Sequence, residues 1–169
     1  MMRLLEAVIA FLFFLLTLPL WLLSGRDLPE LRSETEIVSE VLDLDLSGCE
    51  LQEQLDDHEG ILQDGSTFCR FACGSGAVLT QLRADPCWHP LPADEPVKTI
   101  LYGSAQRAPL CPKGLIPQIE RGYFRLIDHQ LETGRGAPEG ELLDRFSYNF
   151  SLGLYDEDSN TLYYFRLDT

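Results

Sequence analysis

The chain is poor in basic residues. Its 169 residues include 13 Lys+Arg against 27 Asp+Glu, which gives a formal net charge of -14. Such a charge repels phosphate backbones and anionic lipid headgroups. We therefore expect no nucleic-acid partner and no electrostatic docking onto a membrane surface. A solvated acidic surface is the simplest interpretation of the charge.

The sequence also lacks the motifs of common catalytic and cofactor sites. Serines, cysteines and three histidines are present, but none lies in a Gly-x-Ser-x-Gly nucleophile motif. The short stretch Gly74–Gly76 lacks that spacing, and no lysine follows it closely enough for a phosphate-binding loop. The sequence thus predicts no cofactor, and it favours a non-catalytic protein without deciding the question.

A zinc-binding pattern is absent as well. The five cysteines are Cys49, Cys69, Cys73, Cys87 and Cys111, an odd number that leaves at least one unpaired within a monomer. No second pair follows Cys69 and Cys73 at zinc-site spacing. On a strand these two share a face with Phe71, which favours small core residues over metal ligands. One disulfide is compatible with an exported domain, and the sequence does not choose its partners.

The N-terminus contains the longest apolar run. Ala7 to Leu23 are 17 residues without a charge, enough, with flanking residues, for a helix across a hydrocarbon core of about 30 Å. Trp21 suits the membrane interface. The alternative is a cleaved signal peptide, but its best cleavage site places Leu23 at the −3 position, where a small residue is expected. We expect an uncleaved anchor.

The domain organisation follows from this anchor. We expect a transmembrane anchor in residues 1–25, a polar juxtamembrane linker in 26–36 and a single domain in 37–169. A very short N-terminal tail usually stays in the cytoplasm, so the C-terminal domain is expected outside it.

Alternating apolar and polar residues predict an antiparallel sheet. Strands are expected within 37–48, 49–60, 65–73 and 114–130 and as a hairpin within 145–169, with short helices within 74–86 and 96–103. The economical fold is α+β: a transmembrane helix, then an antiparallel sheet of about five or six strands with one or two helices on one face.

One polar loop is a candidate functional site. His58, Glu59 and Asp64 lie within seven residues and, with Asp56 and Asp57 just before them, could supply nitrogen and oxygen ligands to a metal. The competing interpretation, which we prefer, is a two-residue type I′ turn at Asp64-Gly65 between two strands. His58, Glu59, Asp64 and Gly65 are therefore candidate functional residues, and no metal site is assigned.

A second acidic stretch resembles a calcium loop. Asp156, Asp158 and Asn160 occupy positions 1, 3 and 5, but the pattern then needs Gly at position 6 and Glu at position 12. The chain has Thr161 and Leu167 there. We interpret this stretch as the polar turn of a β-hairpin.

Four stretches carry a family resemblance: "DDHEGILQDGSTF", "CWHPLPADEPVKTILYG", "RGYFRLIDH" and "RFSYNFSLGLYDEDSNTLYYFRLDT". They resemble blocks of a family of small, uncharacterised Firmicute proteins that are often membrane-anchored. The family's first block runs close to H-G-G-F-H-G-D-G. Here His58, Gly60, Asp64 and Gly65 agree with it, while Leu62 stands in place of the second histidine. The resemblance implies no established activity and only points to these positions.

Two functions remain open at this point. The first is a single-pass membrane protein whose acidic α+β domain binds a partner protein or a ligand without catalysis. The alternative is a metal-dependent or hydrolytic enzyme centred on the loop from His58 to Asp64.

Overall fold

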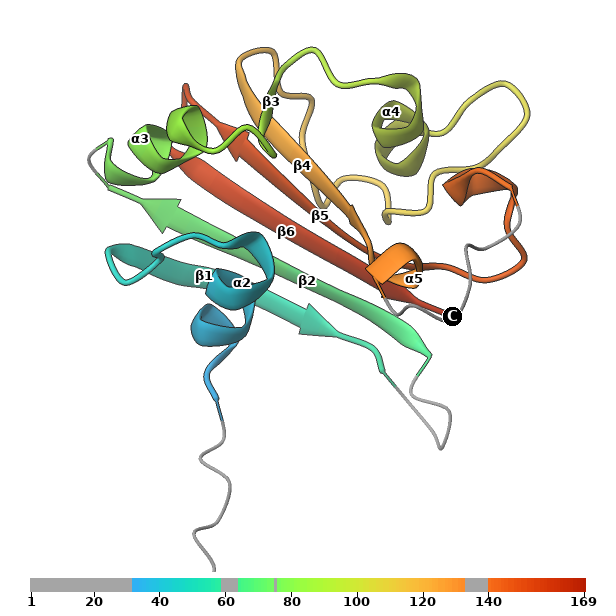
Figure 1. The fold of residues 1–169 in the computed structure, drawn as a ribbon, viewed down its shortest axis with the longest axis horizontal. Helices are drawn as coiled ribbons and strands as arrows, with labels where there is room; N and C mark the ends of the chain where they lie inside the picture. Colours follow the sequence, from blue (N-terminus) through green and yellow to red (C-terminus); the bar gives the residue numbers. More distant parts are fainter. Residues whose placement is uncertain (1–31, 59–63, 75, 133–139) are drawn as a thin grey trace, which may run out of the picture. The chain divides into compact units, whose positions relative to one another are not determined.

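The computed structural model describes residues 32–58, 64–74, 76–132 and 140–169 (Figure 1). Its elements are, in chain order, α2 (Glu34–Leu42), β1 (Cys49–Asp56), β2 (Gly65–Cys73), α3 (Ala77–Ala84), β3 (His89–Pro90), α4 (Glu95–Tyr102), β4 (Gly122–Asp128), α5 (His129–Glu132), the 3-10 turn η1 (Leu142–Asp144), β5 (Asn149–Asp156) and β6 (Thr161–Asp168).

The strands form one six-stranded antiparallel sheet in the order β1-β2-β6-β5-β4-β3. The predicted α+β fold is thus confirmed. The predicted C-terminal hairpin is β5–β6, and it lies in the middle of the sheet. Because both parities of a central strand are covered, residues 150–155 are all buried.

Helices cover both faces of the sheet, so the expectation of helices on one face is wrong (Figure 1). One core joins α2 and α3 to strand residues such as Tyr164. The other joins α4 to residues of opposite parity such as Phe165. Alternation along a strand does not show this, because a strand buried on both sides has apolar residues at every position.

The strand expected within 37–48 is instead the helix α2 followed by an extended segment. Val38 and Leu42, four residues apart, are fully buried on one helix face. Leu44 N–H donates to Ser39 C=O (3.0 Å) and Asp43 N–H to Glu40 C=O (3.3 Å). With Asp43 at φ 51°, these bonds form a Schellman motif that ends the helix. The alternating leucines after it suggested a strand.

The acidic turn of the hairpin is confirmed as a turn. The Asp156 carboxylate accepts hydrogen bonds from Asp158 N–H (2.9 Å) and from the Ser159 hydroxyl (2.7 Å). Asn160 takes a left-handed conformation, with φ 52°. The side chains therefore stabilise the turn itself.

Within the described residues, none of the helices combines the length and apolar character that a membrane crossing requires. The predicted anchor, residues 1–25, lies outside the described residues.

One disulfide joins the first two strands. Cys49 and Cys73 face each other across the β1–β2 ladder with Cα atoms 4.3 Å apart. Of the three remaining thiols, Cys69 and Cys111 are buried and Cys87 is exposed. Burial raises the pKa of the Cys69 and Cys111 thiols to about 12. These two thiols are therefore unreactive near neutral pH.

We predict that removing this disulfide destabilises the domain. The bond closes a loop of sequence separation 24, so Cys49→Ala with Cys73→Ala is expected to lower the free energy of unfolding by about 3 kcal/mol. Urea unfolding of the full chain measures this change. Cys87→Ala, at an exposed thiol, is the control and should change little. In denaturant, three thiols should react with a maleimide before reduction and all five after it; five before reduction would contradict the bond.

Candidate functional site

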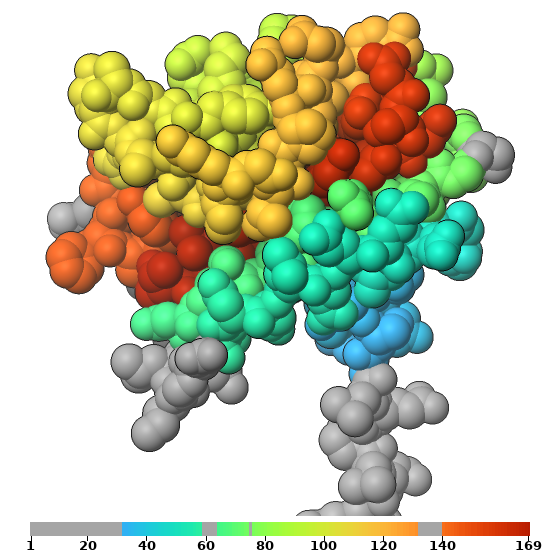
Figure 2. Space-filling view, turned by 180° about the vertical axis from the view of Figure 1, so that it is seen from behind, coloured from blue at the N-terminus to red at the C-terminus, as the bar shows by residue number. Residues whose placement is uncertain are grey.

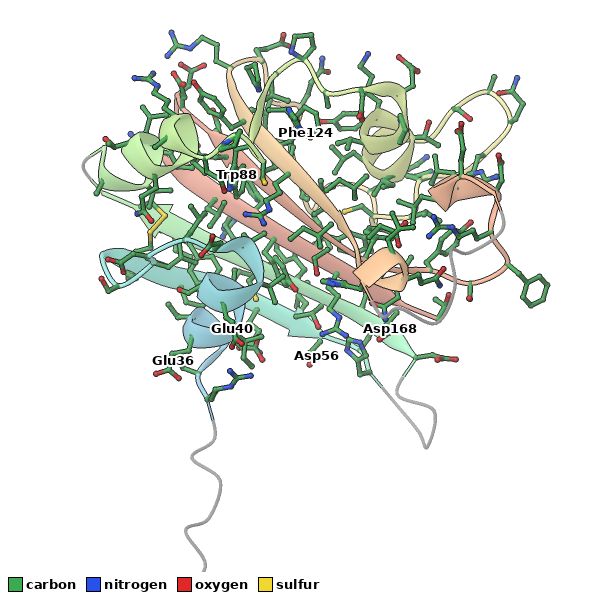
Figure 3. All side chains as sticks on the ribbon, viewed as in Figure 1. Glu36, Glu40, Asp56, Trp88, Phe124 and Asp168 are labelled. Carbon is green, nitrogen blue, oxygen red and sulfur yellow. A yellow bond between two sulfur atoms is a disulfide. The ribbon has the colours of Figure 1, made fainter. Side chains whose placement is uncertain are left out.

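A polar groove opens on the face of the sheet that carries α2. Its volume is about 370 Å³. The lining side chains come from α2, the end of β1, and the facing ends of β2 and β6: Glu34, Ile37, Asp56, His58, Thr67, Tyr164, Arg166 and Asp168. Figure 3 shows Asp56 and Asp168 near each other at one end of the sheet.

Strand register explains why the groove is polar. Asp56 faces Thr67 across β1–β2, Thr67 faces Arg166 across β2–β6, and Arg166 faces Ser151 across β5–β6. Directly paired residues point to the same face of a sheet, so these four form one polar row. Two residues along β2 from Thr67, Cys69 already belongs to the apolar core. The groove begins where that core ends.

His58 is held by the aspartate two residues before it. Its Nδ1 lies 2.6 Å from Asp56 Oδ1, and its backbone N–H donates to the same oxygen (3.0 Å). The hydrogen bond from the His58 ring, then the one from its backbone, lowers the pKa of Asp56. A proton on Nδ1 leaves Nε2 of a neutral imidazole as an acceptor. The Asp56–His58 pair therefore fixes one ring orientation.

Gly65 is required by the position of His58. A Cβ on Gly65 would lie 2.6 Å from the Cα of His58, so only glycine allows this approach. Gly65 does not have the positive φ of a type I′ turn: it is the first residue of β2 and pairs with Asp168. The predicted two-residue turn at Asp64-Gly65 is wrong, because the connection is longer. It runs from Asp57 to Asp64, and its residues 59–63 lie outside the described residues.

Of the candidate loop residues, the structure places His58 beside Gly65. His58 contacts Asp56, and within the described chain no hydrogen bond or ion pair joins His58 to Asp64, which is exposed. Glu59 lies outside the described residues. The described part of the chain contains no group of three His, Cys, Asp or Glu side chains able to hold a metal ion.

Arg166 is the cation of the groove, and its hydrogen bonds are incomplete. Its Nη2 lies 3.2 Å from Asp168 Oδ2. Its Nε is buried without a hydrogen-bond partner, and so is Oδ1 of Asn149, which faces Asp168 across β5–β6. Buried polar atoms usually have a partner in the protein or in bound solvent or ligand. Arg166 Nε and Asn149 Oδ1 therefore indicate that a further polar group, from solvent or from a ligand, binds at this end of the sheet.

A buried chain of hydrogen bonds connects the groove to α5. The Tyr164 hydroxyl lies 3.0 Å from Ser151 Oγ, which lies 2.9 Å from His129 Nε2. Burial raises the pKa of Tyr164, and its bond to Ser151 opposes that shift. Ser151 is fully buried. Because the serine is not accessible, this Ser-His contact does not make an accessible nucleophile.

Sequence reasoning found His58 and missed most of its neighbours. Glu34, Arg166 and Asp168 lie far from it in the chain, and no local motif marks them. The available signal was the polar side chains Arg166 and Asp168 at the end of an otherwise aromatic strand.

No family model, curated protein or solved structure matches the chain. The family resemblance therefore remains a prediction, and the function is inferred from the groove.

We predict that Asp56 contributes to the acid sensitivity of the domain. Its pKa is lowered in the folded state, so its carboxylate stabilises the fold near neutral pH, and that contribution is lost as the pH falls through the lowered pKa. Asp56→Asn should therefore make stability fall less steeply below about pH 4. The effect should stay under about 1 kcal/mol, because the side chain is 45% exposed and solvent screens it.

Urea unfolding at several pH values measures this difference. Glu141→Gln is the control, because Glu141 is exposed and its side chain has no hydrogen bond or ion pair in the described chain. An equal change in both variants would show that Asp56 has no special role.

Proposed function

We propose that this chain is a single-pass membrane protein whose acidic α+β domain binds a ligand, or a segment of a partner protein, in the groove beside α2. Binding occurs without catalysis. The observation that supports this most is the groove itself, which is lined by Asp56, Thr67 and Arg166 and in which Arg166 Nε is left without a partner.

The charges of the groove indicate the chemistry of the ligand. Glu34, Asp56 and Asp168 carry negative charge there, against the single positive charge of Arg166. A ligand with an ammonium or guanidinium group is attracted to the carboxylates, and an acceptor on it can bind Arg166. A volume of about 370 Å³ suits a small molecule or a few peptide side chains.

The disulfide supports a location outside the cytoplasm. Disulfides persist in oxidising compartments and are rare among reduced cytosolic proteins. Together with the predicted anchor, the Cys49–Cys73 bond supports a domain displayed on the outer side of the membrane.

We predict that small cations stabilise the full chain purified in a mild detergent. Free arginine or a short diamine at ten times its Kd should add about 1.4 kcal/mol, which raises Tm by about 3–6 °C. Free glutamate should not. Differential scanning fluorimetry measures the shift.

A pair of variants localises the effect. Glu34→Gln removes a groove carboxylate and should at least halve the shift, while Glu141→Gln removes an exposed carboxylate elsewhere and should preserve it. No stabilisation by cations of either kind, or equal loss in both variants, would contradict a cationic ligand in the groove.

A hydrolytic function is a second candidate, because of the Asp56–His58 pair. A carboxylate that orients an imidazole through Nδ1 leaves Nε2 available as a general base. Under this alternative, with or without a bound metal, His58→Ala lowers hydrolysis of ester or phosphoester substrates by about 100-fold or more.

Activity assays and elemental analysis of the purified chain decide this alternative. His89→Ala, at an exposed histidine, is the control. A stoichiometric metal that is lost in His58→Ala but kept in His89→Ala would favour the metal-dependent enzyme over a binding domain. Absence of both turnover and metal would exclude this second candidate.

A further inference from the structure

The edge strand β1 is open on one side. Among the described residues it is the first strand of the sheet order, and β2 is the one strand it pairs with. In the space-filling view, β1 lies uncovered along the rim of the molecule (Figure 2). Most of its residues are exposed, and Leu55 is an exposed large apolar side chain. The edge at the other end, β3, has only two residues. An open strand of eight residues offers backbone donors and acceptors to another extended chain.

Negative charge surrounds this edge. From Glu34 to Asp57 there are nine acidic residues and no lysine or arginine: Glu34, Glu36, Glu40, Asp43, Asp45, Glu50, Glu53, Asp56 and Asp57. They come from α2, the segment that follows it, β1 and the residue after β1, and α2 packs against the same end of the sheet (Figure 1). Figure 3 shows Glu36, Glu40 and Asp56 on this side of the molecule. Among the β1 carboxylates, Glu53 pairs with Arg70 at 3.2 Å and Asp56 contacts the His58 ring.

The charge argues against a second copy of this chain as the occupant. Antiparallel pairing of two β1 strands would bring Glu50, Glu53 and Asp56 of one copy close to the same residues of the other. Like charges opposite each other on paired strands are destabilising. The register shift between Leu51 and Glu53 further disturbs regular self-pairing. The same acidic residues favour a basic strand.

We propose that β1 is a docking edge for an extended, lysine- or arginine-rich segment of a partner protein. The segment adds to the sheet as a seventh strand, antiparallel or parallel to β1. Backbone hydrogen bonds supply affinity, and ion pairs with Glu50 and its neighbours supply specificity. The open side of β1 adjoins the groove at Asp56, which lines the groove, but Glu50 is not among the groove's lining residues. Variants at Glu50 and at Glu34 therefore test the two sites separately.

The test uses the full chain in detergent and an eight-residue peptide that alternates lysine with valine or threonine. We expect saturable binding by fluorescence anisotropy and new protection of the β1 amides from hydrogen exchange. A control peptide of the same sequence, N-methylated at alternate residues, keeps the charge and loses backbone donors. It should bind at least about tenfold more weakly, because strand addition depends on those donors.

Two charge reversals locate the peptide. Glu50→Lys lies on β1 and Glu141→Lys lies elsewhere, and both residues are exposed without a side-chain partner in the described chain. Glu50→Lys should weaken binding about five- to tenfold and Glu141→Lys less than about twofold. Amide protection in the wild-type chain gives an independent result if a variant folds poorly.

Several outcomes would overturn the docking edge. No binding at millimolar peptide, equal binding of the methylated peptide, or equal weakening by both reversals would each exclude strand addition. A dimer of the chain that Glu50→Lys strengthens would identify a second copy as the occupant. These results do not bear on the groove, because Glu34→Gln and the cation shifts test it separately.

Discussion

The antiparallel pairing of β2 with β6 joins the N-terminal strands β1 and β2 to the strands β3 to β6. It runs without a register shift from Gly65 opposite Asp168 to Ala72 opposite Thr161. Phe68 and Phe165 meet in one core, and residues of the other parity meet in the second. Because both cores are built on this ladder, its loss would expose both at once. Without this ladder, the N-terminal hairpin of β1 and β2 would have no sheet to join.

The same ladder builds the groove. It places Thr67 beside Arg166, and β1 extends the row to Asp56. The groove lies over the β1, β2 and β6 part of this row, whereas Ser151 on β5 is fully buried. Further along the sheet, Trp88 packs closely on Gly153, where an added Cβ would lie 2.6 Å from the indole. One face of the sheet is thus closed at one end and open at the other, and the open end carries the charges.

Local sequence patterns predicted the helices and strands whose limits depend on residues close to them in the sequence. Asp94 accepts a hydrogen bond from Val97 N–H (3.1 Å) and Gly103 ends the same helix, so the sequence located α4. The hairpin β5–β6 followed from alternation and its polar turn. The helix α2 was missed because the leucines after it continue an alternating pattern. The turn predicted at Gly65 is wrong because glycine is needed there for the close approach of His58, and not for a positive φ.

The sequence by itself determined the acidic surface, the antiparallel strands and the absence of common catalytic motifs, since each depends on composition or on neighbouring residues. Only the tertiary structure decided that Cys49 pairs with Cys73 and that Glu34 and Arg166 line one groove. It also decided that β1 is the edge and β6 is central. Strand order depends on which apolar faces pack together across long separations, and the pattern within a strand is the same in many orders.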